Sequence, residues 1–194
     1  QKKNKGGRTV KDLHKVVAIA GKGGVGKTTL GSILIRYLVE EWKKGPVLAV
    51  DADPNSNLNE MLGVRIKATI GEARELMKKD VPAGMTKDVW LEYKVNEAVI
   101  EGEGFDLLVM GRPEGSGCYC AANSLVKKYI DALKGNYQYV VVDNEAGMEH
   151  ISRLVTQDID YLYVVSDATP RGIHTAKRIL ELIKELKLNI RHTY

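Results

Sequence analysis

Cysteine is scarce in this chain. The only two cysteines among its 194 residues are Cys118 and Cys120. A disulfide framework of the kind that holds small secreted domains together is therefore excluded. Two cysteines separated by a single residue are instead expected to bind a metal, to take part in catalysis or to be inert.

Long apolar runs and a strong net charge are also missing. No apolar stretch approaches the length of about 18 residues that crosses a bilayer, so we predict no membrane-spanning segment. The formal net charge is only +4, which does not by itself argue for a nucleic-acid partner. The basic segment Gln1–Arg8 lacks the apolar core of a secretory signal. We therefore expect a cytoplasmic protein that binds neither nucleic acid nor membrane.

Length and composition are those of one soluble domain. The chain is 44% hydrophobic and 28% charged, and it is long enough for a sizeable core. We predict a basic, mobile N-terminal extension over residues 1–14 and one domain over residues 15–194. The last six residues are interpreted as the start of a further strand, so we expect the domain to continue beyond them.

Strand-like and helix-like segments alternate along the whole chain. Apolar, two-sided strands that alternate with helices are typical of a parallel sheet covered on both faces. We therefore predict an α/β fold of the P-loop NTPase type, with a mostly parallel sheet and helices on both faces. The expected strands are 16–20, 46–51, 105–110, 137–143 and 161–166, and the expected helices are 28–42, 58–62, 70–78, 121–133, 148–157 and 172–186, with a helix or an irregular excursion over 87–100.

A glycine-rich loop between the first strand and the first helix satisfies the phosphate-loop pattern G-x-x-x-x-G-K-[ST]. Glycines allow successive backbone N–H groups to turn towards a phosphate chain, and the helix N-terminus adds the positive end of its dipole. Lys27 is expected to reach the β- and γ-phosphates of ATP or ADP, and Thr28 to place its hydroxyl on Mg²⁺. The predicted nucleotide-binding residues of this loop are Gly21, Lys22, Gly23, Gly24, Val25, Gly26, Lys27, Thr28 and Thr29.

The loop carries a second lysine, Lys22, which an ordinary phosphate loop does not need. The form Lys-Gly-Gly-x-Gly-Lys-Thr-Thr resembles the deviant Walker A motif of the MinD/ParA/nitrogenase-iron-protein class. In that class the extra lysine reaches the nucleotide of a partner subunit. The resemblance therefore implies an ATPase that forms a nucleotide-driven homodimer, with Lys22 and Lys27 among its catalytic residues.

Two carboxylate-bearing segments follow later strands, whose carboxyl ends face the ligand crevice in sheets of this kind. Asp53, in Asp-Ala-Asp-Pro, is the candidate catalytic carboxylate that acts on the attacking water, and Asn57 is a candidate switch residue. Asp143 closes the apolar run of the expected strand 137–143 and is predicted to hold Mg²⁺, directly or through water. Gly147 is predicted to bend the backbone towards a γ-phosphate. The resemblance identifies the two segments as switch I and switch II.

The cysteine pair follows a glycine-rich segment and precedes the expected helix at 121. In extended backbone, residues two apart point to the same side, so Cys118 and Cys120 can present both sulfurs to one metal. Two thiolates fill half of the four-coordinate shell that Zn²⁺ or square-planar Ni²⁺ prefers. A two-fold homodimer supplies the other pair, so we predict a shared Ni²⁺ or Zn²⁺ site at the dimer interface.

Together these features resemble one branch of the class, the CooC-type nickel-insertion ATPases that mature carbon monoxide dehydrogenase. The specific matches are Gly117-Cys118-Tyr119-Cys120 and the string from Asp143 to His150, DNEAGMEH. The resemblance implies that nucleotide and metal both control dimerisation, and that nickel is delivered to the active-site cluster of a client enzyme. The client can be carbon monoxide dehydrogenase or the related acetyl-CoA synthase, and the physiological metal stays open.

Two other functions of the same class are open to a chain with these phosphate-handling motifs. A DNA-partitioning or membrane-surface positioning ATPase, as in ParA and MinD, accounts for the loop motifs and the basic N-terminus but not for the cysteine pair. An electron-transfer ATPase that resembles nitrogenase iron protein would hold an iron–sulfur cluster between subunits. That family uses two cysteines far apart in sequence, which argues against it here.

Overall fold

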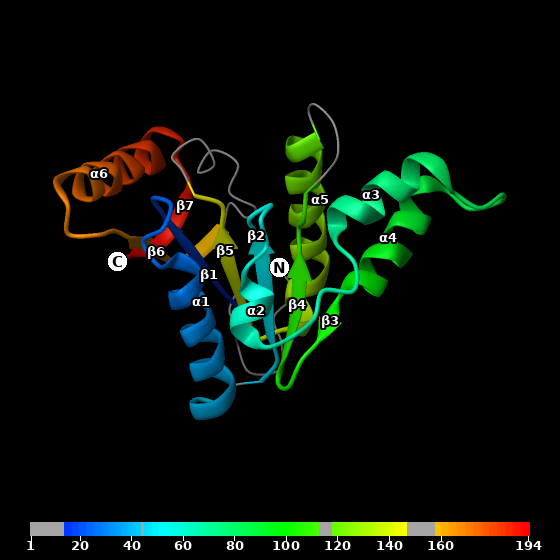
Figure 1. Ribbon diagram of the computed structural model, residues 1–194, viewed down its shortest axis with the longest axis horizontal. Coiled ribbons are helices and arrows are strands. Elements are labelled where there is room, and N and C mark those ends of the chain that lie inside the picture. Colours follow the sequence, from blue (N-terminus) through cyan, green and yellow to red (C-terminus); the bar gives the residue numbers. More distant parts are fainter. Residues whose placement is uncertain (1–13, 44, 113–117, 147–157) are drawn as a thin grey trace, which may run out of the picture.

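The computed structural model describes residues 14–43, 45–112, 118–146 and 158–194, and shows a seven-stranded sheet with the strand order β3-β4-β2-β5-β1-β6-β7 (Figure 1). Neighbouring strands are parallel except for the pair β3–β4. The strands are β1 (Lys15–Gly21), β2 (Val47–Ala52), β3 (Ile100–Glu101), β4 (Phe105–Val109), β5 (Tyr139–Asn144), β6 (Asp158–Val165) and β7 (Asn189–Thr193). The predicted α/β class with a mostly parallel sheet is confirmed.

Helices cover both faces of this sheet. Side chains of α1 and α2 pack on one face, and those of α3, α4, α5 and α6 pack on the other. Figure 1 shows α6 at one end of the sheet and α3 and α4 at the opposite end. The helices are α1 (Lys27–Arg36), which continues as the π-helical turn η2 (Tyr37–Glu41), then α2 (Leu58–Leu62), α3 (Ile70–Lys79), α4 (Lys87–Ala98), α5 (Cys118–Leu133) with the 3₁₀ turn η3 (Lys134–Asn136), and α6 (Pro170–Glu185).

The central strands are buried on both faces, which explains their continuous apolar sequences. In β5, Val140, Val141 and Val142 are all fully buried; Val141 packs with α1 and α2, whereas Val140 and Val142 pack with α3 to α5. Alternate residues of a strand point to opposite faces, so each face receives its own set of branched side chains. The parallel register brings the carboxyl ends of β1, β2, β4, β5 and β6 to one edge of the sheet, where the predicted nucleotide motifs begin.

Some details differ from the sequence-based expectation, and others lie outside the described residues. Helix α5 begins at Cys118, three residues before the expected start at 121. The segment 87–100, for which a helix or an irregular excursion was expected, is the helix α4 followed by the short antiparallel strand β3, which was not expected. The expected helix 148–157 lies outside the described residues, as does the predicted extension apart from residue 14.

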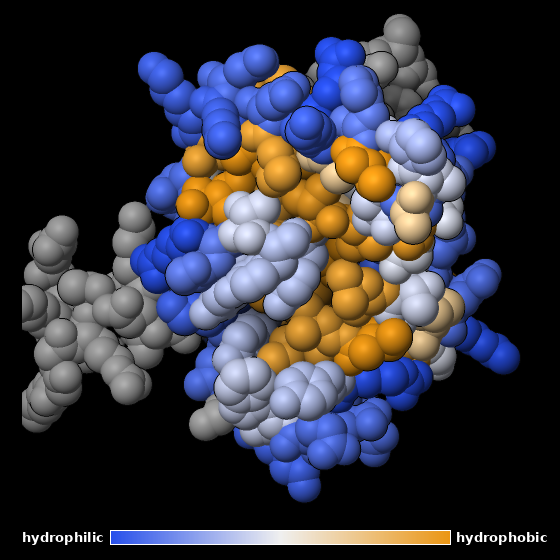
Figure 2. Space-filling model, turned by 90° about the vertical axis from the view of Figure 1, so that its left-hand side faces the viewer, coloured by the Kyte–Doolittle hydropathy of each residue, from blue (hydrophilic) through white to orange (hydrophobic). Residues whose placement is uncertain are grey.

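The end of the sheet that carries β7 has an apolar surface. Figure 2 shows hydrophobic side chains gathered on the side of the molecule formed by α1, β7 and α6. Aromatic rings stack across the last strand pair, Tyr161 on His192 and Tyr163 on Tyr194. The exposed hydrophobic residues of α1, η2 and α6 include Ile33, Tyr37, Ile173 and Leu180, and Tyr194, directly after β7, is exposed as well. No helix in the described part of the chain is long and apolar enough to cross a membrane.

Candidate nucleotide site

The phosphate loop connects the buried strand β1 to α1, as the motif predicts. Gly21 ends the strand so close to β6 that a Cβ atom there would lie 2.2 Å from the carbonyl oxygen of Val165. Gly26 precedes the first residue of α1 and has a φ of 93°, in the region that side chains other than glycine rarely adopt. These two glycines place the loop directly over the N-terminus of α1, where backbone N–H groups are free to bind an anion.

Lys27 is the first residue of α1, and its side chain turns back into the loop. Its exposed fraction is only 7%, and its ammonium donates a 3.2 Å hydrogen bond to the carbonyl oxygen of Lys22. Burial lowers the pKa of the Lys27 ammonium, and the negative charges of Asp143 and Asp53 oppose that shift. The loop therefore holds a buried cation where a phosphate chain would lie, flanked by two carboxylates from different strands.

Thr28 and Asp143 meet at the carboxyl edge of the sheet. The hydroxyl of Thr28 donates a 2.6 Å hydrogen bond to Oδ2 of Asp143 at the end of β5. Asp143 is 1% exposed, and its other oxygen, Oδ1, has no hydrogen-bond partner in the structure as described. Burial raises the pKa of the Asp143 carboxyl, whereas the Thr28 hydroxyl and the charge of Lys27 lower it.

This pair fits a magnesium ion. Mg²⁺ prefers oxygen ligands, and it is commonly held by one or two protein oxygens together with water and substrate phosphate. A buried carboxylate oxygen without a donor is costly unless a cation or a water satisfies it. The residues that sequence analysis assigned to Mg²⁺, Thr28 and Asp143, are therefore in contact with each other and have unused acceptor capacity.

The segment predicted as switch I, Asp51–Asn57, forms a tight turn at the end of β2. The carboxylate of Asp51 accepts hydrogen bonds from the backbone N–H groups of Asp53, at 3.1 Å, and Leu58, at 3.0 Å. It thereby holds the two ends of the turn together. Asp53 in turn accepts the N–H of Asn55 at 2.8 Å. Burial raises the pKa of Asp51 to about 7, against the effect of those two backbone hydrogen bonds. Asn57, the other predicted switch residue, is exposed immediately before α2 and makes no side-chain cap to that helix.

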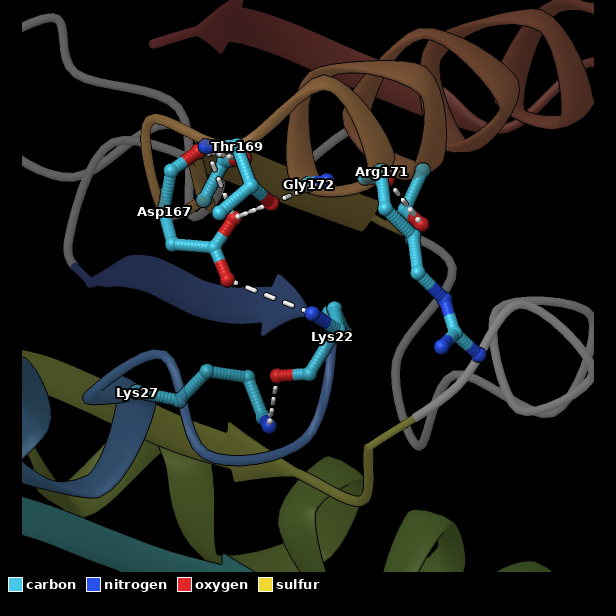
Figure 3. Close-up of polar contacts among 8 residues, drawn as sticks. Lys22, Lys27, Asp167, Thr169, Arg171 and Gly172 are labelled. Carbon is cyan, nitrogen blue, oxygen red and sulfur yellow. Dashed lines mark hydrogen bonds and ion pairs between the residues drawn. The ribbon is translucent and has the colours of Figure 1, made fainter.

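Two residues of this edge were not predicted to be part of the site. Asp51 belongs to the motif from which Asp53 was selected, but its burial and its role in closing the turn are visible only in the fold. Asp167 follows β6, and its carboxylate accepts a 3.2 Å hydrogen bond from the ammonium of Lys22 (Figure 3). No pattern in the sequence indicated that Lys22 would contact a residue 145 positions later.

The backbone at the predicted metal-binding cysteines differs from the expected one, unlike that of the phosphate loop. The sequence argument assumed extended backbone, and this assumption is wrong, because Cys118 and Cys120 form the first turn of α5. Residues two apart in a helix are separated by about 200° around its axis, so the backbone does not present them in parallel as a strand would. Their side chains, and the switch residue Gly147, lie outside what the structure describes. Among the described residues no group of three or more His, Cys, Asp or Glu side chains could hold a metal.

Comparison with known proteins places this geometry in a family context. The family model described as an AAA domain matches residues 14–193. An uncharacterised ATP-binding protein of Methanocaldococcus jannaschii is 48% identical over 184 residues, which cover 92% of this chain and 72% of that protein. The carbon monoxide dehydrogenase accessory protein CooC of Rhodospirillum rubrum is 32% identical over 185 residues, which cover 88% of this chain and 69% of that protein.

A solved structure also resembles the fold of this chain. The MinD cell division protein of Aquifex aeolicus superposes with a TM-score of 0.63 at 25% identity, covering 92% of this chain and 66% of that protein. The likeness to this structure therefore extends over most of the chain.

Proposed function

Because the chain belongs to the AAA domain family and has ParA/MinD-like P-loop ATPases among its relatives, we propose that it is a Mg²⁺-dependent ATPase that forms a homodimer with bound nucleotide. The observation that carries the proposal is the 2.6 Å contact between Thr28 and Asp143 beside the buried ammonium of Lys27. This contact brings the carboxylate of Asp143, from β5, next to the hydroxyl of Thr28 and the ammonium of Lys27 at the start of α1.

Each residue has a separable task in this reaction. The loop N–H groups and Lys27 bind the phosphates of ATP and offset their charge. Asp53 accepts a hydrogen bond from the attacking water and orients it, and Asp51 fixes the turn that carries Asp53. When bound, Mg²⁺ neutralises charge on the phosphate oxygens. Lys22 contacts the phosphates of the partner's nucleotide, as the resemblance to the deviant Walker A class implies.

The test of this function joins hydrolysis to mass in solution. Phosphate release is measured with ATP and Mg²⁺, with ATP and EDTA, and with a Lys27→Ala variant, while light scattering follows the molecular mass. We expect release and a doubled mass only when wild-type protein, ATP and Mg²⁺ are present together. Release that is unchanged in the Lys27→Ala variant would come from a contaminant and would refute the proposal.

At a finer level, we propose that the dimer serves nickel insertion into a client such as carbon monoxide dehydrogenase. The support is the 32% identity with the accessory protein CooC and the pair Cys118 and Cys120 at the start of α5. The four cysteines of a dimer would hold one Ni²⁺ or Zn²⁺ between the subunits. A helix N-terminus favours the thiolate form of cysteines near it, and thiolates are the form that binds such metals. This activity belongs in the cytoplasm, with the client enzyme.

Equilibrium metal binding decides this finer proposal. Wild-type protein is dialysed against Ni²⁺ or Zn²⁺ and compared with a Cys118→Ser/Cys120→Ser variant, and the bound metal is measured per subunit. We expect one metal per two subunits in the wild type and loss of that metal in the variant. If stoichiometry and affinity are the same in both proteins, the cysteines are not the ligands.

A positioning ATPase is the second candidate, and the structural likeness to MinD favours it. This function would use the same nucleotide cycle without any metal at the cysteines. ATP-dependent, salt-sensitive binding to DNA or to anionic vesicles, unchanged in the double cysteine variant, would support the positioning function.

A further inference from the structure

The ammonium of Lys22 is bound within its own chain. It lies 3.2 Å from Oδ2 of Asp167, in the loop between β6 and α6, and the two side chains are 32% and 36% exposed (Figure 3). The class resemblance gives Lys22 a task in the opposite direction, towards the nucleotide of a second subunit. A lysine cannot hold both positions, so the contact with Asp167 must break when two copies pair.

The carboxylate of Asp167 is fixed in place by the start of α6. Its Oδ1 accepts both the N–H of Thr169, at 3.2 Å, and the hydroxyl of Thr169, at 2.5 Å. The Thr169 oxygen then accepts the N–H of Gly172, at 3.0 Å, as the N-terminal cap of the helix. A Cβ atom at position 172 would lie 1.9 Å from Oδ1 of Asp167, so only glycine admits this approach.

The carboxylate of Asp167 is also stabilised in its ionised form. The hydrogen bonds from Thr169 and from Lys22 lower the pKa of Asp167, which is therefore ionised at neutral pH. Lys22 therefore faces a fixed negative charge in the loop between β6 and α6. Such a group is suited to hold a lysine that must later leave, because a partly exposed ion pair is weak enough to be exchanged.

A second contact connects this arrangement to the nucleotide. The carbonyl oxygen of Lys22 accepts the ammonium of Lys27, at 3.2 Å. Phosphate competes for the same ammonium, because Lys27 is the lysine that the phosphate-loop motif directs to the β- and γ-phosphates. The backbone of Lys22 is thus connected to the nucleotide site through Lys27, whereas its ammonium is held by Asp167.

We propose that Asp167 is a positioning residue that holds Lys22 in its own subunit and thereby opposes ATP-dependent pairing of two copies. The inference rests on the proposed function, since it assumes that Lys22 acts across the dimer. Asp167 sets how much nucleotide and protein are needed before two subunits close. Two such ion pairs break when a dimer forms, one in each subunit, so their energy corresponds to an effect of about two- to thirty-fold on the dimer dissociation constant.

The test measures the dimer dissociation constant by sedimentation with Mg²⁺ and a non-hydrolysable ATP analogue. The Asp167→Asn variant removes the charge, and its amide oxygen can still accept the N–H of Thr169. We expect its dimer to be about two- to thirty-fold tighter than that of the wild type, because the charge is lost from both subunits. The matched control is Asp88→Asn, which makes the same change of charge at an exposed ion pair with Lys128 on the opposite end of the sheet, and which should leave the constant unchanged.

One further variant separates loss of the charge from loss of the helix cap. Asp167→Glu keeps the charge and is expected to restore weaker pairing. If the wild type pairs and Asp167→Asn pairs equally or more weakly, Asp167 only caps α6 or assists Lys22, and this inference fails while the proposed dimer stands. If neither protein pairs with the analogue, both the inference and the proposed dimer fail.

Discussion

The hydroxyl of Thr28 donates a 2.6 Å hydrogen bond to the buried carboxylate of Asp143, which lies 115 residues further along the chain. Thr28 is in the first turn of α1 and Asp143 is near the end of β5, the strand that pairs with β1 in parallel register. The contact therefore depends on the whole β1–α1 unit being docked on the sheet. Any substitution that shifts α1 relative to β5 is therefore expected to weaken magnesium binding.

The first prediction concerns this pair. Thr28→Val removes the hydroxyl with little change of volume, so the Mg²⁺ concentration that half-saturates ATP hydrolysis should rise by at least about tenfold. Phosphate release over a magnesium titration measures it. Thr175→Val is the control, since it removes a threonine hydroxyl that donates to a backbone carbonyl of Arg171 within α6. Equal magnesium curves for the two variants would show that Thr28 is not a ligand.

The second prediction separates catalysis from binding. Asp53→Asn should lower the rate of hydrolysis by about 10²- to 10⁴-fold, the usual contribution of a general base, and leave nucleotide affinity largely intact. Lys27→Ala should weaken nucleotide binding as well, because it removes the buried cation. Fluorescent-nucleotide binding and single-turnover hydrolysis are measured on both variants. A wild-type hydrolysis rate in Asp53→Asn would refute the assignment.

The third prediction concerns Asp51 and pH. An unfolded aspartate loses its proton near pH 4, whereas burial raises the pKa of Asp51 to about 7 in the fold. Between these values the folded state binds more protons than the unfolded state, so the Asp51 contribution to stability falls as pH rises and is constant above about pH 8. The expected loss is on the order of 2 kcal/mol from pH 5 to pH 7.

Urea unfolding in EDTA without nucleotide tests this at several pH values. Asp51→Asn cannot ionise and cannot accept both backbone N–H groups, so the variant should be less stable than the wild type at pH 5. The difference should narrow as pH rises towards 8. Stability curves that stay parallel across this range would show that Asp51 does not titrate there.

The sequence predicted those parts of the molecule that depend on local physics. The apolar run Val140–Val142 is a buried strand wherever it pairs, and the glycines at 21 and 26 can turn the chain in ways that other residues cannot. The phosphate loop, switch I and Asp143 were located correctly at one sheet edge because parallel strands always end together.

Other features depend on contacts between distant segments. The ion pair of Lys22 with Asp167 joins residues that only the β1–β6 pairing brings together, and Asp-Ala-Thr-Pro by itself indicates no more than a helix cap. The burial of Asp51 depends on how switch I folds over β2. Cys118 was placed before the helix because it follows a glycine-rich segment that joins a strand to the helix, but local sequence is a weak guide to where a helix begins.

The last prediction assigns two independent routes to the dimer. Lys22→Gln removes the charge that is proposed to contact the partner's nucleotide, so ATP with Mg²⁺ should no longer drive pairing, although single subunits still bind nucleotide. Metal-driven pairing should survive in this variant at least in part, because thiolates form a separate bridge between subunits.

The Cys118→Ser/Cys120→Ser variant should behave in the opposite way: it should pair with ATP and fail to pair with Ni²⁺ or Zn²⁺ alone. Light scattering on both variants and the wild type is measured without additions, with ATP and Mg²⁺, with metal, and with both. If Lys22→Gln pairs with ATP as the wild type does, Lys22 is only a surface charge; if the cysteine variant still pairs with metal, the bridge lies elsewhere in the chain.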